Sequence, residues 1–295
     1  MTSPRQSPDR SAHESPWRRF LRADIVPRLL VILVGVPLVV LAALHGGLVF
    51  RLLIGVVILL GLREFAAMTA AKGYEPYTLL CLAAGLGCAW AGVTGGAPLP
   101  LVLTAMVLIV MVVELFRREI RHPLVHIGNA LLGALYVGWL GSYIVQLREL
   151  PSPPDVTYDL GLRALGLMAA ITWTCDTAAY LVGVAVGSRP LLKRVSPRKS
   201  LEGAVGGMLG AVAAGAVAAA TFAPFVTPVQ GALIGLTGSV LAQTGDLVES
   251  LLKRDAGIKD TAGLLPGHGG VLDRLDSVLF TAPFIYYVTV HLTAL

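Results

Sequence analysis

Long apolar stretches recur along this chain, and they constrain its fold more than any other feature of the sequence. They run for about 18 to 25 residues each, and a helix of that length crosses the roughly 30 Å hydrocarbon core of a bilayer. The composition agrees, because 55% of the 295 residues are hydrophobic and only 14% are charged, whereas charged residues make up about a quarter of a typical soluble protein. We therefore expect an all-α, polytopic membrane helix bundle.

The apolar stretches predict about nine transmembrane helices. Their expected ranges are 25–44, 47–62, 78–95, 98–116, 126–147, 162–187, 204–223, 228–250 and 272–293. The stretch at 204–223 is rich in Ala and Gly, a composition that lets helices pack closely in lipid and that would also suit a homodimer.

The chain divides into three parts by composition. Residues 1–22 are rich in Ser, Pro and Arg and contain no apolar run, so we expect a disordered cytoplasmic tail. The N-terminal transmembrane helices are expected over 23–150, and a second transmembrane region, which holds the unusual polar residues, over 151–295. The three cysteines lie inside apolar stretches, where they predict neither a disulfide framework nor a zinc site. They are Cys81, Cys88 and Cys175.

Basic residues lie between the apolar stretches and are distributed unequally. All but three of the 23 lysines and arginines fall on one side of the predicted spans, the exceptions being Arg51, Arg148 and Arg163. Because Lys and Arg accumulate on the cytoplasmic side, we expect the N-terminus in the cytoplasm and the C-terminus outside. The Ala, Gly and Arg content suggests a bacterial plasma (inner) membrane. The net charge of +5 is spread over loops, which favours anionic lipid and phosphate as partners and argues against nucleic acid.

Polar residues interrupt the apolar pattern first at the end of the 228–250 stretch. At about 100° per residue, four of them share one face of a helix, and these are Gln243, Asp246, Ser250 and Lys253. An isolated aspartate inside a membrane costs about 2.5–3.5 kcal/mol, so Asp246 should have a compensating cation or hydrogen-bond donor. A structural salt bridge to Lys253 or to a neighbouring helix would satisfy this need as well as a functional site would.

A glycine-rich segment follows, and charged residues surround it. Its glycines at 267, 269 and 270 can bring backbone N–H groups close to phosphate oxygens, although such a segment alone is more often a tight turn. Carboxylates suited to Mg²⁺ and donors suited to phosphate lie on both sides of it. They are Asp246, Asp260, Asp273 and Asp276, and Lys253, Arg254, Lys259, His268 and Arg274. This combination predicts a nucleotide–metal site, because nucleotidyl transfer relies on a metal and on phosphate donors.

The run from Ser250 to Asp276 resembles the signature of the phosphatidate cytidylyltransferase (CDP-diglyceride synthase) family. The matching residues between these two are, in order, Lys253, Arg254, Lys259, Asp260, His268, Gly269, Gly270, Asp273 and Arg274. Two upstream elements are also similar. The first contains Asp176, Tyr180 and Gly183, and the second spans 196–203, where Arg198 replaces an expected lysine. The motifs cover about residues 172–280, and the N-terminal half matches only as a set of hydrophobic spans.

The resemblance implies a Mg²⁺-dependent nucleotidyltransferase of phospholipid biosynthesis that converts CTP and phosphatidate to CDP-diacylglycerol and pyrophosphate. It implies Asp246 and Asp273 as ligands of a catalytic metal pair, with Mg²⁺ in one site and room for a second cation, and Asp276 as a further ligand. The other implied catalytic residues are Lys253, Lys259 and Asp260. The implied substrate-binding residues are Asp176, Ser196, Lys199, Glu202, Ser250, Arg254, His268, Gly269, Gly270 and Arg274.

Other functions fit the sequence less well. A secondary transporter would also carry intramembrane aspartates and glycine-interrupted helices, but it predicts matching repeats in the two halves, whereas the unusual polarity here is C-terminal. A CDP-alcohol phosphotransferase would show a D-G-x2-A-R pattern, which is absent. A polyprenol kinase is harder to exclude on chemistry and fits the motifs less well.

Several polar and aromatic residues have simpler interpretations. His122 and His126 are four residues apart, but no third metal ligand stands beside them, so we expect interfacial histidines. Arg63 and Glu64 are expected to form an interfacial pair. Asp176 could line the site or serve as a structural hydrogen-bond hub. The tryptophans at 90, 139 and 173 are expected to be packing or interface anchors.

Overall fold

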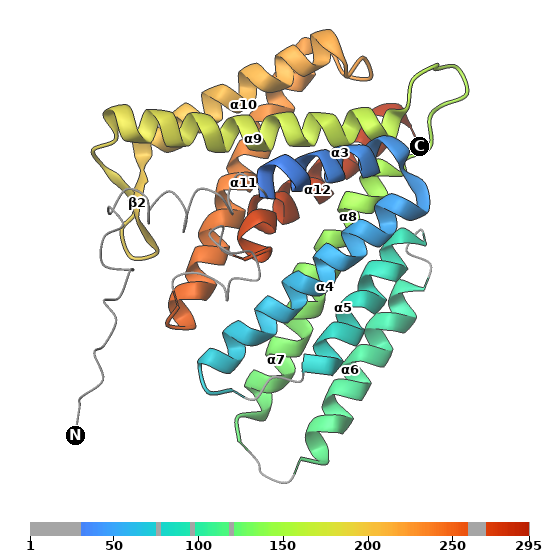
Figure 1. The fold of residues 1–295 in the computed structure, drawn as a ribbon, viewed down its shortest axis with the longest axis vertical. Coiled ribbons are helices and arrows are strands. Elements are labelled where there is room, and N and C mark those ends of the chain that lie inside the picture. Colours follow the sequence, from blue (N-terminus) through green and yellow to red (C-terminus); the bar gives the residue numbers. More distant parts are fainter. Residues whose placement is uncertain (1–30, 75–77, 95–97, 118–120, 259–269, 295) are drawn as a thin grey trace, which may run out of the picture.

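The chain folds into a helical structure, and its computed structural model describes residues 31–74, 78–94, 98–117, 121–258 and 270–294 (Figure 1). Within these ranges the sheet consists of two short strands, so the expected all-α class is confirmed. Each expected apolar stretch overlaps a helix. The N-terminal elements are η3 (Val31–Gly35, a π-helix), α3 (Val36–His45), α4 (Gly47–Ala71), α5 (Thr78–Val93), α6 (Leu99–Leu115), α7 (Pro123–Gly133), η4 (Ala134–Trp139, a π-helix) and α8 (Leu140–Arg148).

The second half of the chain contains the longest helices and the two strands. These elements are α9 (Leu160–Val186), β1 (Pro190–Leu192), β2 (Ser196–Ser200), α10 (Leu201–Thr221), α11 (Pro228–Asp255) and α12 (Leu272–Thr293). Side-chain caps fix where several of them begin. The Ser200 hydroxyl accepts the Gly203 N–H at 3.1 Å and so starts α10, while Thr227 and Gln230 form a capping box at the start of α11.

The described part of the chain contains four helices that are long and apolar enough to cross a membrane, which marks it as a membrane protein. They are Pro123–Arg148, Leu160–Val186, Leu201–Thr221 and Leu272–Thr293. Three shorter apolar helices accompany them, at Leu33–His45, Thr78–Trp90 and Leu99–Leu115. The expected total of about nine spans stays a prediction.

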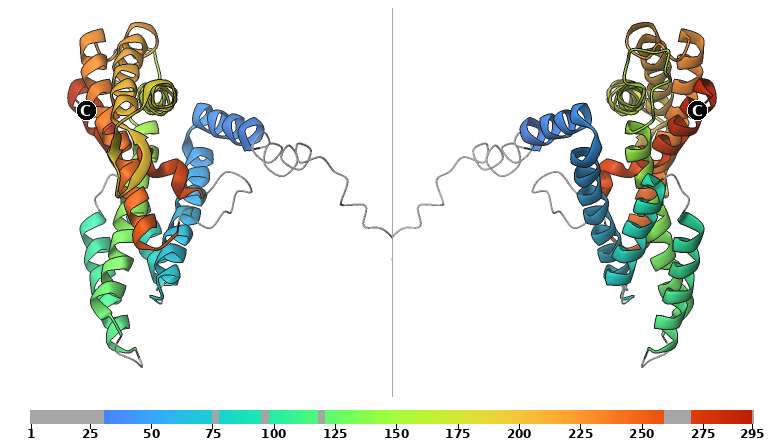
Figure 2. Two further views of the ribbon diagram at one scale, coloured as in Figure 1. Left: turned by 90° about the vertical axis from the view of Figure 1, so that its left-hand side faces the viewer. Right: turned by 90° about the vertical axis from the view of Figure 1, so that its right-hand side faces the viewer.

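Helix α12 joins the two halves of the chain. In Figure 1, α9 and α10 lie along one end of the molecule, while α4 to α7 extend toward the other end. Figure 2 shows α3 projecting from the side of this body. Helix α12 packs against α11, α8 and α9 and also contacts α4. One hydrophobic core therefore runs through both halves, from Phe50 of α4 to Leu279 of α12.

Glycines allow α9, α10 and α11 to approach one another closely. A Cβ atom added to Gly215 of α10 would lie 2.0 Å from the Gly231 carbonyl oxygen of α11. One added to Gly206 would lie 2.5 Å from Val182 of α9. Backbones can come this close in lipid only where a side chain is absent. The small residues of 204–223 are thus used for packing within the chain.

The two strands form an antiparallel hairpin between α9 and α10, with Pro190 opposite Ser200 and Leu192 opposite Ser196. Figure 1 shows this hairpin extending from the ends of α9 and α10 on the side of α11. The hairpin also contacts α11 through β2. It therefore brings residues 196–200 to the polar end of α11.

Candidate active site

The polar face of α11 points toward several different elements. Gln243 donates from Nε2 to the Ala204 carbonyl oxygen of α10 at 3.2 Å. About two turns further along, the Ser250 hydroxyl donates to Oδ1 of Asp246 at 3.5 Å. Helical periodicity thus indicated the residues of this face, but the folded chain decides which partner each one meets.

Asp246 forms an ion pair with Lys199 of β2, and each side chain is about one-third exposed, at 32% and 31%. The aspartate has the compensating cation that its position in an apolar helix requires, although this cation comes from the hairpin and not from Lys253. Asp176 of α9 and Asp276 of α12 lie within electrostatic range of both Asp246 and Lys199. Four elements therefore contribute charges to one site.

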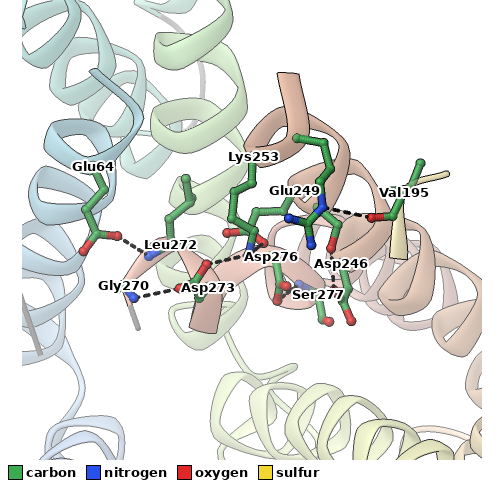
Figure 3. Close-up of polar contacts among 12 residues, drawn as sticks. Glu64, Val195, Asp246, Glu249, Lys253, Gly270, Leu272, Asp273, Asp276 and Ser277 are labelled. Atoms are coloured by element: carbon green, nitrogen blue, oxygen red, sulfur yellow. Dashed lines mark hydrogen bonds and ion pairs between the residues drawn. The ribbon is translucent and has the colours of Figure 1, made fainter. Parts of the chain in front are cut away.

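Lys253 is the centre of a second, more buried cluster. Its ammonium donates to Oδ1 of Asp273 at 2.7 Å and pairs with Glu249 one turn earlier on α11 (Figure 3). The exposed fractions of these side chains are 13% for Lys253, 15% for Asp273 and 1% for Glu249. Burial opposes the charged form of Lys253, but hydrogen bonds to Asp273 and Glu249 outweigh burial and raise the pKa of this lysine.

The buried glutamate of this cluster is not among the site residues predicted from the sequence. Glu249 lies three residues after Asp246 and four before Lys253, and a pair of opposite charges at that second spacing shares one helix face. This spacing is a signal that could have identified it.

Asp273 sits in the first turn of α12, where two carboxylates bind backbone N–H groups. Its Oδ2 accepts the Gly270 N–H at 2.8 Å. Glu64 of α4 accepts the next two, from Val271 at 2.9 Å and from Leu272 at 2.8 Å, the second of which is drawn in Figure 3. Glu64 is only 2% exposed. The sequence predicted an interfacial pair of Glu64 with Arg63 and did not predict this contact with α12.

The hairpin is fastened to the helices on both sides of the site. The Glu202 carboxylate accepts the Ser188 hydroxyl at 2.8 Å and the backbone N–H groups of Ser188 and Arg189 at 3.1 and 3.2 Å. Arg254 of α11 donates from Nε to the Val195 carbonyl oxygen at 3.3 Å, next to Ser196 (Figure 3). Glu202 and Arg254, both expected to bind substrate, thus hold the hairpin in place.

Asp276 and Tyr136 lie on the buried side of the two clusters. Asp276 is 9% exposed and accepts its neighbour's backbone N–H, from Ser277, at 2.6 Å. Tyr136 belongs to the π-helix η4, is 5% exposed, and lies near Glu249 and Asp276. Its hydroxyl has no hydrogen-bond partner among the described residues. Short π-helical turns often occur at functional sites.

The remaining expected site residues divide into two groups. Arg274 is exposed on the first turn of α12, and Gly270 is buried just before that turn. Four others lie outside the described residues, namely Lys259, Asp260, His268 and Gly269.

The expected metal ligands lie on two helices, Asp246 on α11 and both Asp273 and Asp276 on α12. Within the described ranges, no group of three or more His, Cys, Asp or Glu side chains is arranged to hold a metal ion. Asp246 and Asp273 are each paired with a different lysine. His126, discounted above as a ligand, contacts Glu114 at 3.1 Å and Arg117 at 2.5 Å.

Comparisons with known proteins agree with the motifs. The sequence model described as "Cytidylyltransferase family" matches residues 26–292. A Synechocystis protein named phosphatidate cytidylyltransferase is 33% identical over 285 residues, covering 90% of this chain and 96% of the relative. The chloroplastic phosphatidate cytidylyltransferase 5 of Arabidopsis thaliana is 30% identical over 277 residues, covering 84% and 68%. The Bacillus subtilis phosphatidate cytidylyltransferase is 37% identical over 162 residues, covering 55% and 58%.

Proposed function

Because the chain belongs to the cytidylyltransferase family, we propose that it converts CTP and phosphatidate to CDP-diacylglycerol and pyrophosphate. The observation that carries this proposal is the 33% identity to the Synechocystis phosphatidate cytidylyltransferase, which extends over 90% of the chain. The two lysine–carboxylate clusters at the end of α11 support it, because nucleotidyl transfer needs cations that bind phosphate beside acidic groups.

In the proposed reaction, a phosphate oxygen of phosphatidate attacks the α-phosphorus of CTP. A new P–O bond forms there while the bond to the β-phosphate breaks, and pyrophosphate leaves on the opposite side. No covalent enzyme intermediate is needed. Lys199 and Lys253 supply ammonium groups for the phosphate oxygens, and Arg254 adds a guanidinium beside them. The lysines exchange their carboxylate partners for substrate phosphates when CTP binds.

We propose that Mg²⁺ is bound by Asp246 and Asp273, with Asp276 as a further ligand and room for a second cation. The donor chemistry fits, since carboxylate oxygens are the ligands that Mg²⁺ prefers. Lys199 and Lys253 hold Asp246 and Asp273, so the same lysine movement that binds phosphate would release both carboxylates. Bound Mg²⁺ would neutralise negative charge on the phosphates.

We further propose about nine membrane spans in a bacterial plasma membrane, with a cytoplasmic N-terminus and an external C-terminus. This topology would place Lys199 and Lys253 on the cytoplasmic side, where CTP is present. Single cysteines introduced at Lys193 and Asp155, which lie on opposite sides in this topology, test it by their labelling with an impermeant reagent in intact cells. A homodimer would need a surface other than the α10 glycines, which face the chain's own helices, and its mass in detergent tests it.

The proposed function is tested with purified protein in detergent, using CTP labelled at either the α- or the γ-phosphate. Transfer of the α-label to an organic-extractable product, dependent on phosphatidate and abolished by EDTA, is the expected result. Transfer of the γ-label instead would identify a lipid kinase. No transfer of either label by folded protein would contradict both enzymatic functions and favour a transporter.

A further inference from the structure

Glu64 links the N-terminal half of the chain to the helix that carries Asp273. It lies on α4, 207 residues before Val271 in the sequence. Its two carboxylate oxygens accept one N–H each, from Val271 and Leu272, in a buried contact, and Figure 3 shows the bond to Leu272. A side chain from a distant helix therefore serves as the cap that α12 lacks in its own sequence, because Val271 at the N-cap position has no side-chain oxygen.

The first N–H groups of a helix have no partner within the helix and need one when they are buried. A carboxylate satisfies them well, because it accepts charge-assisted hydrogen bonds and interacts favourably with the positive end of the helix dipole. At the start of α12, two carboxylates accept the backbone N–H groups. Glu64 binds Val271 and Leu272, and Asp273 binds Gly270.

This division determines which carboxylate oxygen of Asp273 is free of backbone hydrogen bonds. One of its oxygens, Oδ2, accepts the Gly270 N–H at 2.8 Å, and the other, Oδ1, accepts from Lys253 at 2.7 Å. If Glu64 were absent, the Val271 and Leu272 N–H groups would be buried without an acceptor. Asp273, the nearest carboxylate along the helix, would then be drawn toward the backbone and away from Lys253.

We propose that Glu64 is a positioning residue, which holds the first turn of α12 so that Oδ1 of Asp273 stays available to the reaction centre. This inference rests on the proposed function, in which Asp273 takes part in cytidylyl transfer. Glu64 is not expected to touch either substrate, because its carboxylate is buried against the α12 backbone. Its effect should therefore appear in turnover and not in substrate binding.

The test is Glu64→Gln, which keeps the size of the side chain but replaces one acceptor oxygen with an NH₂ group. We expect kcat to fall by about 10- to 100-fold, as happens when a reacting group is displaced by about an ångström, with the KM values for CTP and phosphatidate little changed. The matched control is Glu114→Gln, which alters another buried carboxylate, 9% exposed, on α6. Helix α6 packs against α5 and α7, so this control should keep its kcat.

A second measurement does not depend on turnover. Hydrogen–deuterium exchange of peptides covering 270–280 should be faster in Glu64→Gln than in the wild-type protein or in Glu114→Gln. Glu64→Asp, which keeps the charge but withdraws the carboxylate by one methylene, should change both kcat and exchange in the same direction. Glu64→Asp also provides a second variant for both measurements if Glu64→Gln does not fold.

The outcomes separate this inference from the function on which it rests. Full kcat in both Glu64 variants, with wild-type protein active, overturns the inference and leaves the proposed function standing. A loss matched by Glu114→Gln, or unchanged exchange over 270–280, also overturns it. A wild-type protein that transfers no cytidylyl label contradicts the proposed function and, with it, this role of Glu64 in catalysis.

Discussion

Lys199 and Asp246 form an ion pair that joins the β-hairpin to the polar face of α11. The two residues are 47 positions apart in the sequence, and the hairpin brings them together. In the proposed reaction Lys199 leaves Asp246 for a phosphate of CTP. The hairpin would thereby respond to nucleotide binding.

Lys199→Gln should weaken CTP binding. A hydrogen bond to a charged group contributes about 1.5–3 kcal/mol, so we expect the KM for CTP to rise by about 10- to 100-fold. Steady-state kinetics with varied CTP measures this change. Lys193→Gln is the control, because Lys193 is exposed in the turn of the same hairpin, and its KM should match the wild type. An unchanged KM in Lys199→Gln would contradict the role of Lys199.

Asp246→Asn should remove turnover while the protein remains in the membrane. We expect at least a roughly hundredfold loss of kcat, the size expected when a preorganised charge at a reaction centre is lost. Asp255→Asn is the control, since Asp255 lies at the end of the same helix and pairs with Lys72 in an exposed contact. The label-transfer assay measures turnover, and the protein level in membrane fractions shows whether the variant remains in the membrane. Retained turnover in Asp246→Asn would remove this residue from the mechanism.

Lys253→Met should destabilise the fold. It leaves Glu249 and Asp273 as buried carboxylates without their shared cation, and breaking a buried ion pair costs about 3–5 kcal/mol. Thermal unfolding in detergent measures this loss of stability. The loss should shrink as the buffer is acidified, because Glu249 and Asp273 no longer repel each other once they are protonated. Lys72→Met breaks an exposed pair and should cost less than about 1 kcal/mol. Equal melting temperatures for the two variants would show that the cluster contributes no more than a surface pair.

Gly245→Ala should push α11 and α12 apart at the site. A Cβ atom at this position would lie 2.3 Å from the Asp276 carbonyl oxygen, and overpacking of this kind costs about 1–3 kcal/mol. Turnover should fall as well, because Asp246 and Asp276 stand on the two separated helices. At Gly55 of α4 an added Cβ meets nothing within 4 Å, so Gly55→Ala should keep its turnover and should not lower the melting temperature, since Ala favours a helix more than Gly does. A fully active Gly245→Ala would show that the two helices can shift without disturbing the site.

Tyr136→Phe should leave the protein as stable as the wild type or more stable. Its hydroxyl is buried without a partner among the described residues, and an unsatisfied buried polar group costs about 1–3 kcal/mol. Tyr143→Phe gives the opposite comparison, because that hydroxyl contacts the Tyr287 hydroxyl at 2.6 Å and its removal should lower the melting temperature. A marked destabilisation of Tyr136→Phe would indicate that the hydroxyl binds a water molecule or an ion.

The sequence was sufficient to predict the helices and most of the residue types at the site. Apolar stretches long enough to cross a bilayer set the approximate positions of the helices, and three of the predicted site residues, Asp246, Lys253 and Asp273, lie in the two charged clusters. Periodicity assigned Asp246 and Lys253 to one face of α11. It could not assign their partners, because a helical face does not reveal which neighbouring helix or strand lies opposite it.

The contacts that the sequence did not predict involve two kinds of segment. The strand at 190–192 is only three residues long and uncharged, and the strand at 196–200 is largely polar. Neither shows the alternation of apolar and polar residues that predicts a strand, so the pairing of Lys199 could not be foreseen. Glu64 lies in an apolar helix of the N-terminal half, 207 residues before Val271. Its contact with α12 depends on the packing of α4 against α12, which no local pattern encodes.

The different exposure of the two lysine clusters has a consequence for the effect of ionic strength. Lys199 and Asp246 are 31% and 32% exposed, so dissolved salt can screen their attraction over the Debye length of about 8–10 Å at physiological concentrations. Lys253 and Asp273 are only 13% and 15% exposed and are shielded from that screening. Added salt should therefore loosen the hairpin from α11 while the contact between α11 and α12 persists, which makes the hairpin the part of the site that is sensitive to electrolyte.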